Sequence, residues 1–177
     1  MTPGKTYIIY QRYAETDTTE ASAISSVSFT MPEVLKIESD VYFLNPANGV
    51  ASLVKPGTSV TALLKNFKDS DKLTVYKNGK EIKGNETVGT GCEVRLYKDG
   101  KIADKYTIAI TGDVNGDGKT TITDYLQIKN RIQSAKPLDK VPEYACDVNG
   151  DGKITITDYL KLKYCIQNGT APEQNRY

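Results

Sequence analysis

Apolar and polar residues follow two different patterns along the chain. Through the first two thirds they alternate in short runs, which is typical of half-buried strands, whereas in the last third apolar residues recur three and four positions apart, as in amphipathic helices. The sequence therefore predicts an α+β fold, in which a small β-rich module with one helix is followed by an all-α module.

Two β-hairpins are predicted within the β-rich part. Asn78-Gly79 and Asp99-Gly100 each lie between two apolar runs, and both dipeptides favour the tight turns that join antiparallel strands. The predicted strands are residues 73–76, 81–83, 92–97 and 103–110.

One helix is predicted ahead of these hairpins. Residues 55–58 read Lys-Pro-Gly-Thr, which indicates a turn that leads to a helix N-cap. Apolar residues follow at helical spacing, namely Val60, Leu63, Leu64 and Phe67. With a further strand at 42–44, these elements predict a compact α+β module over residues 31–111.

Residues 1–30 predict two more strands, at 6–13 and 24–30. Two strands alone are only marginally stable in water. The segment resembles the last two strands of a fibronectin type III-like domain, through Pro3, Gly4 and Tyr7. The resemblance implies that this segment is the remnant of a longer immunoglobulin-like β domain.

A duplicated segment fills most of the C-terminal part, residues 112–177. Residues 113–133 and 147–167 are identical at 16 of 21 positions and are offset by 34 residues. The connection between them contains Pro137 and Pro142, which suit a turn or a short broken helix. The last ten residues are polar, so we expect a loose tail.

Each copy begins with a near match to the calcium-binding loop of an EF-hand. Both read Asp-x-Asn-x-Asp-Gly and carry an aspartate at the twelfth place, and oxygen ligands at such spacing suit the hard Ca²⁺ ion. The predicted ligands of the first loop are Asp113, Asn115, Asp117, Lys119 through its carbonyl, Thr121 directly or through water, and Asp124. Those of the second loop are Asp147, Asn149, Asp151, Lys153, Thr155 and Asp158. Two calcium ions are therefore predicted.

Two alternative interpretations of these loops are weaker. A metal-free polar turn is possible for one copy, but three carboxylates within twelve residues repel one another unless a cation compensates them. A phosphate-binding loop is disfavoured because Gly112 and Gly118 are one residue too far apart for its glycine spacing.

Only the helix that leaves each loop is predicted, near residues 124–133 and 158–167. Strand-like residues precede the first loop and a proline-interrupted stretch precedes the second, so each copy is half of an EF-hand. A calcium sensor of the calmodulin type needs a helix on both sides of the loop. Calcium is therefore predicted to be structural, because the small unit has little core of its own.

The duplicated DVNGDGK loop and helix resemble the type I dockerin of bacterial cellulosome-like assemblies, over residues 112–168. The resemblance implies a secreted module that folds on two Ca²⁺ and docks onto a cohesin domain of a scaffolding protein, or scaffoldin. It would anchor its parent protein to an extracellular, cell-surface complex of an anaerobic bacterium that degrades polysaccharide.

The same resemblance implies a docking surface built from the tenth and eleventh loop places and from the exposed face of the following helix. These positions are Ile122, Thr123, Lys129, Asn130, Ile156, Thr157, Lys163 and Tyr164. The alternatives are that the two isoleucines belong to the core or bridge the loops, and that the lysines are merely solvated. Because the copies are nearly identical, a pseudo-twofold axis would allow two docking orientations.

The α+β module resembles the companion module, often called an X module, that precedes dockerins in gut and rumen clostridial proteins. The VKPGTSV motif and the hairpins carry this resemblance, which implies a module that stiffens or extends the dockerin. No linker separates Ile110 from Asp113, so we expect the two modules to pack as one rigid unit.

Composition excludes several functional classes. The chain has no histidine, which removes the commonest general base, and no pair of candidate catalytic carboxylates occurs outside the loops, so we do not expect an enzyme. A net charge of +1 without a basic patch indicates no nucleic-acid partner. No apolar run approaches the roughly 20 residues of a membrane span. We expect a monomer when no partner is bound.

The remaining candidate residues are cysteines and tyrosines. Three cysteines cannot form a complete disulfide framework, so buried thiols are expected, with a Cys146–Cys165 disulfide as the alternative. The alternative function is carbohydrate binding through tyrosines, or a purely structural calcium-stabilised module of a secreted glycan-active protein. The candidate tyrosines are Tyr42, Tyr76 and Tyr97.

Overall fold

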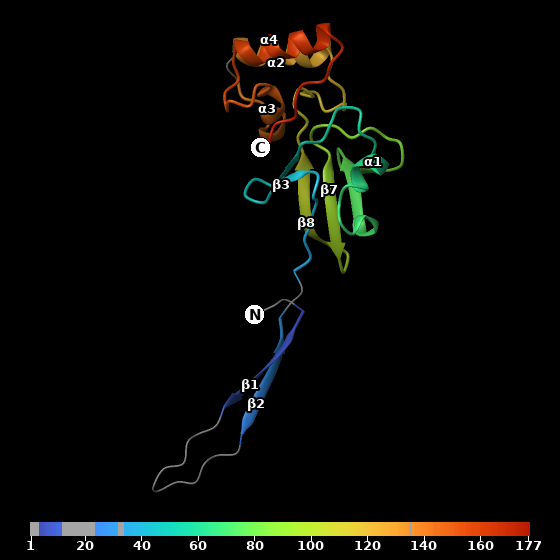
Figure 1. Ribbon diagram of the computed structural model, residues 1–177, viewed down its shortest axis with the longest axis vertical. Coiled ribbons are helices and arrows are strands. Elements are labelled where there is room, and N and C mark those ends of the chain that lie inside the picture. Colours follow the sequence, from blue (N-terminus) through green and yellow to red (C-terminus); the bar gives the residue numbers. More distant parts are fainter. Residues whose placement is uncertain (1–3, 12–23, 32–33, 135) are drawn as a thin grey trace, which may run out of the picture. The chain divides into compact units, whose positions relative to one another are not determined.

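The computed structural model describes residues 4–11, 24–31, 34–134 and 136–177. The chain forms two compact units, Met1–Leu35 and Lys36–Tyr177 (Figure 1). Strands and helices both occur, so the α+β class is confirmed. The separate domain boundaries at residues 30 and 111 stay predictions.

The described residues of the first unit form two antiparallel strands. Strand β1 (Thr6–Gln11) pairs with β2 (Ser25–Thr30), and the rings of Tyr7 and Phe29 stack 5.9 Å apart. Pro3 and the last two residues of the predicted first strand lie outside the described residues. The likeness to a fibronectin type III domain stays a prediction.

A six-stranded sheet forms the β-rich part of the second unit, with the order β3-β4-β8-β7-β5-β6. Neighbouring strands are antiparallel except for β4 and β8, which are parallel. The strands are β3 (Phe43–Asn45), β4 (Val50–Ser52), β5 (Leu73–Lys77), β6 (Lys80–Ile82), β7 (Glu93–Lys98) and β8 (Lys101–Ile108).

Both predicted hairpins are present. Asn78 and Gly79 join β5 to β6, Asp99 and Gly100 join β7 to β8, and all four residues have positive φ. Two consecutive positive φ values define the type I′ turn, whose twist matches that of the flanking strands.

The predicted helix is present but short. Helix α1 (Val60–Leu64) begins after Ser59, whose hydroxyl oxygen accepts a hydrogen bond from the Ala62 N–H at 3.3 Å. A short 3₁₀ turn, η1 (Ser70–Lys72), precedes β5. Phe67 lies beyond the end of α1, yet it is buried, and its ring packs 5.2 Å from that of Tyr42.

Three helices follow the last strand, and they gather beyond one end of the sheet (Figure 1). They are α2 (Ile122–Ser134), α3 (Lys140–Cys146) and α4 (Ile156–Gln167). The expectation that no helix precedes either loop is wrong for the second loop, because α3 ends directly before Asp147. Pro142 is tolerated there because it lies in the first turn, where its missing N–H has no helical acceptor.

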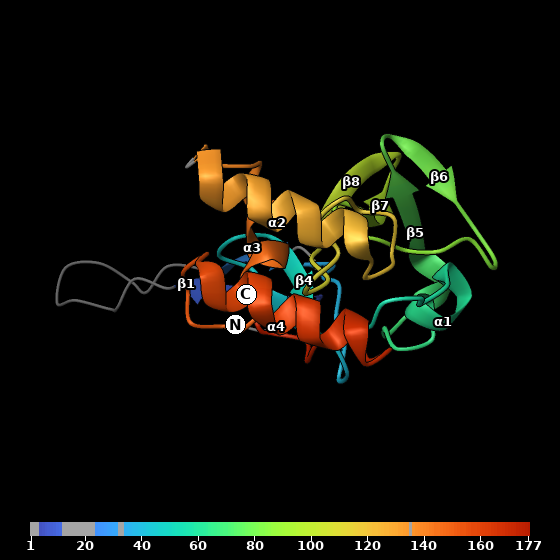
Figure 2. The ribbon, with the colours of Figure 1, turned by 90° about the horizontal axis from the view of Figure 1, so that it is seen from above.

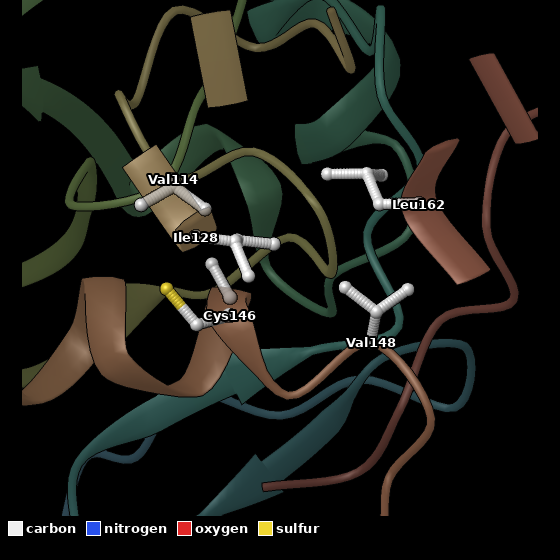
Figure 3. Close-up of a cluster of buried hydrophobic side chains, with 6 residues drawn as sticks. Val114, Ile128, Cys146, Val148 and Leu162 are labelled. Carbon is white, nitrogen blue, oxygen red and sulfur yellow. The ribbon is translucent and has the colours of Figure 1, made fainter. Parts of the chain in front are cut away.

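The two copies of the repeat share one small apolar core beneath α2 and α4. Val114, Ile128, Cys146, Val148 and Leu162 converge in it (Figure 3). All three cysteines are buried free thiols, and burial raises the pKa of Cys146 to about 12. The disulfide alternative is therefore wrong in this structure. None of the described helices has the length and apolar character that crossing a bilayer would require.

The C-terminal segment is packed, so the expectation of a loose tail is wrong. The Tyr177 ring stacks on Tyr144 with centroids 5.2 Å apart, and its hydroxyl lies 2.7 Å from that of Thr111. Burial raises the pKa of Tyr177 to about 12. The Asn175 amide donates to the Asp147 carbonyl oxygen at 2.7 Å. Polar composition misleads here because Gln174, Asn175 and Tyr177 each form hydrogen bonds with residues elsewhere in the second unit.

Removal of the Tyr177 side chain should therefore destabilise the second unit. We expect Tyr177→Ala to lower the free energy of unfolding by about 2 kcal/mol, because a partly buried aromatic ring that stacks on Tyr144 is lost. Urea denaturation measures this change. Tyr164→Ala is the matched control, since that ring is 67% exposed, and it should cost less than about 0.5 kcal/mol. Equal losses in both variants would show that the tail is not packed.

Candidate metal centre

Glycines at the fourth and sixth places give the two loops the same backbone shape. Gly116 and Gly118 have φ values of +74° and +84°, and Gly150 and Gly152 have +76° and +80°. Only glycine adopts this conformation without strain. The sequence predicted the role of the sixth-place glycine. It did not predict that the fourth place also requires glycine, although an Asn-Gly dipeptide in each copy is a signal for such a turn.

The twelfth-place carboxylates are held at the start of each helix. The N–H and hydroxyl of Thr121 donate to Asp124 Oδ2 at 2.9 and 3.0 Å, and the Thr155 N–H donates to Asp158 Oδ2 at 2.9 Å. In the second copy, Thr155 and Asp158 form a reciprocal capping box. The helices consequently begin two residues before the predicted starts, at Ile122 and Ile156.

The first-place aspartates differ between the loops. Asp113 Oδ2 accepts hydrogen bonds from the N–H groups of Gly118 at 3.1 Å and Thr90 at 2.8 Å, whereas its buried Oδ1 has no partner. Asp147 uses both oxygens within its own loop, because Oδ1 accepts from Gly150 and Oδ2 from Gly152.

The donors of each loop suit a hard cation. Among the described residues, no three acidic, histidine or cysteine side chains converge into a cluster by themselves. Calcium takes six to eight oxygens, however, and amide, hydroxyl and main-chain carbonyl groups supply part of such a set. The unpartnered Oδ1 of Asp113 fits this interpretation, because a buried carboxylate oxygen without a donor is costly unless a cation satisfies it.

Asp113 is also the acid most perturbed by its surroundings. It is fully buried, and this burial raises its pKa to about 6, against an opposing effect of the hydrogen bonds from Thr90 and Gly118. The negative charges of Asp124 and Asp117 act in the same direction as burial. A nearby cation would offset these charges and favour the ionised form.

All eight predicted docking residues are exposed, on the start and outer face of α2 and α4. Ile122 and Ile156 are each 57% exposed, so the alternative that they belong to the core is wrong. The sequence interpretation missed Leu126 and Leu160, which follow the isoleucines by one helical turn and are also exposed. Their spacing of four residues from Ile122 and Ile156 is the signal that could have identified them.

The candidate carbohydrate-binding tyrosines do not form a free platform. Tyr42 is buried, and the Arg95 guanidinium lies over the Tyr76 ring, 4.0 Å from its centroid. Tyr97 lies next to Tyr76, with ring centroids 6.5 Å apart. This arrangement does not favour sugar stacking on Tyr42 or on the covered face of Tyr76.

Comparison with known families identifies the duplicated region. Residues 111–167 match the family model of the dockerin type I domain, which confirms that this segment is a type I dockerin domain. Searches among curated proteins and among solved structures gave no match. Dockerin domains in general bind calcium and dock onto cohesin domains in extracellular, cellulosome-type complexes.

The raised pKa of Asp113 predicts a pH dependence when calcium is chelated. The folded-state pKa of about 6 exceeds the ordinary value of 3.8, so the contribution of this group to stability is full below pH 3.8 and is lost as the pH rises through 6. Between pH 4 and 7, the native chain should lose up to about 3 kcal/mol relative to Asp113→Asn.

Urea denaturation of both proteins in excess chelator measures this difference. The variant is the control for all other titrating groups, including Glu93 and Glu143, whose pKa values are lowered by Lys105 and Arg131 respectively. Identical pH profiles for the two proteins would contradict the predicted role of Asp113.

Proposed function

We propose that the chain is a calcium-dependent docking module that anchors its parent protein to a cohesin domain on a scaffoldin. The dockerin match carries the general function, and the arrangement of α2 and α4 supports the details. The two helices lie side by side (Figure 2). One loop precedes each of them, so both loops help to position a single paired surface.

The strongest support is that the repeat packs on itself through equivalent residues. Tyr125 and Tyr159 occupy the same place in the two copies, and their rings stack with centroids 4.3 Å apart and an interplanar angle of 24°. Their hydroxyl groups are also hydrogen-bonded to each other. When a residue packs against its counterpart in the other copy, the two copies are related by an approximate twofold axis that runs between these residues.

Because of this approximate twofold symmetry, the exposed face of α2 and the exposed face of α4 are nearly equivalent. Ile122 and Ile156 have the same exposure, and Leu126 and Leu160 are 45% and 52% exposed. A partner turned by half a turn would therefore meet almost the same apolar residues. We infer that a cohesin can dock in either orientation, with Lys129 and Asn130 or Lys163 and Tyr164 at the margin.

Calcium would be held by the predicted ligands, with one ion in each loop. A bound ion supplies positive charge that offsets the carboxylates of its loop. The chain's own residues then fix the helices, since Asp124 and Asp158 connect each loop to the first turn of the following helix. The ion is structural in this proposal, because the surface that docks depends on these helix positions.

The wider setting follows from the same function. We infer that the parent protein is secreted by an anaerobic bacterium and takes part in an extracellular polysaccharide-degrading complex at the cell surface. Within it, this chain is a non-catalytic anchor, monomeric before it binds cohesin. The β-rich part acts as an X-like module that supports the dockerin.

Charge substitutions on the docking surface test this proposal. We expect Ile122→Asp or Ile156→Asp alone to weaken cohesin binding less than about tenfold, because the other half remains available. The double variant should weaken it more than about 100-fold, since burying an unpaired carboxylate in either orientation is costly. Isothermal titration against a panel of cohesins, in calcium and in excess EDTA, measures both effects.

Ile102→Asp is the matched control, because Ile102 is an isoleucine that is 45% exposed on strand β8 and belongs to neither α2 nor α4. It should leave the affinity unchanged. Binding that persists in excess EDTA, or in the double variant, would contradict the proposal. A calcium-stabilised chain that binds no cohesin of the panel would support the purely structural alternative.

A further inference from the structure

The two calcium loops have nearly identical sequences but different surroundings. The first loop packs tightly against the α+β module: a Cβ on Gly116 would lie 2.5 Å from the Thr90 carbonyl oxygen, and a Cβ on Gly118 would collide with the Val88 carbonyl group. The Gly57 N–H donates to the Gly118 carbonyl oxygen at 2.7 Å. Residues 57 and 88–90 thus close one side of the first loop.

No segment of the α+β module packs against the glycines of the second loop in this way. A Cβ on Gly152 would meet no atom within 4 Å, and the atoms nearest to a Cβ on Gly150 would belong to the side chain of Asn175, at 3.0 Å. Residues 150–153 are exposed, whereas Gly116 and Gly118 of the first loop are buried. Solvent therefore reaches the second loop more easily.

The surroundings also change how the first-place aspartate is bonded. The Thr90 N–H comes from outside the loop and holds Asp113 through Oδ2 alone, so Oδ1 keeps its acceptor capacity. In the second loop, Asp147 Oδ1 already accepts from the N–H groups of Gly150 and Asp151. An ion that bound Asp147 through Oδ1 would compete with these hydrogen bonds.

We propose that the segment Val88–Thr90 of the α+β module is an integral part of the first calcium site, with Thr90 as a positioning residue. The proposal rests on the two calcium sites proposed above. Asp113 is preorganised with one oxygen available, and the module blocks one route of ion escape. The first site binds calcium more tightly and releases it more slowly than the second.

The expected difference is large enough to measure. A hydrogen bond to a charged group changes an equilibrium by roughly tenfold to 100-fold. Preorganisation contributes mainly by removing the cost of ordering the ligands when the ion binds. We therefore expect calcium release from the first loop to be at least about tenfold slower than release from the second.

Stopped-flow mixing of the calcium-loaded chain with a fluorescent chelator measures release without any docking partner. Two phases of equal amplitude are expected. Asp113→Ala should remove the slow phase and Asp147→Ala the fast phase. A single phase containing two ions, or a slow phase that belongs to Asp147, would overturn the inference.

Gly89→Ala tests the role of the module directly. Its new Cβ would collide with the Gly116 carbonyl group and would lie 2.8 Å from the Gly118 nitrogen, so the module must move away from the first loop. The slow phase should accelerate at least about tenfold while the fast phase stays unchanged. Equal acceleration of both phases, or of neither, would overturn the inference.

Gly84→Ala is the matched control in the same module. It strains a backbone with φ of +62°, but its Cβ would meet no atom within 4 Å, so both release rates should stay unchanged. If Gly89→Ala does not fold, Thr90→Val replaces it. The Thr90 hydroxyl accepts from the Ile110 N–H at 3.1 Å and helps to hold this segment, so its loss should also accelerate the slow phase alone.

The experiment separates this inference from the proposed function. Two bound ions with equal release rates would overturn the role of Val88–Thr90 but leave calcium-dependent docking in place. A chain that binds no calcium at either loop would instead contradict the proposed function itself.

Discussion

The rest of the C-terminal region depends on the hydrogen bonds that the twelfth-place carboxylates accept from their own loops. Asp124 accepts through Oδ1 from the N–H groups of Val114 and Asn115, and through Oδ2 from Thr121, so one side chain joins both ends of its loop to the start of α2. Asp158 does the same for α4 through Asn149 and Thr155. Helices of 13 and 12 residues are marginal in isolation, so their positions depend on these anchors and on the small shared core.

The region combines internal symmetry with an asymmetric environment. The stacking of Tyr125 on Tyr159 relates the two copies, and the exposed apolar residues of α2 and α4 repeat accordingly. This symmetry does not extend to the surroundings of the loops. The α+β module covers the first loop, whereas the C-terminal segment contacts the second loop. Symmetry on one face and asymmetry on the other are compatible, since the predicted docking residues of both copies remain exposed.

Features specified by neighbouring residues could be predicted from the sequence. Asn-Gly and Asp-Gly turns define both hairpins, and the repeated Asp-x-Asn-x-Asp-Gly motif defines both loops. Features that depend on distant partners were missed: β4 is a short, fully buried run without alternation, and it is a strand because it pairs with β8. The packing of Tyr177 and the contact between Thr90 and Asp113 likewise join residues more than 20 positions apart. No local pattern encodes such contacts.

In the proposed function, ions in both loops fix α2 and α4 and thereby create the docking face. Native mass spectrometry combined with amide hydrogen exchange tests it on a single sample. We expect two calcium ions per chain, with amides in α2 and α4 that exchange at least about tenfold faster once a chelator removes the ions, because the ions contribute to the stability of the folded region. Fewer than two ions at saturating calcium, or unchanged protection of both helices after the ions are removed, would contradict it.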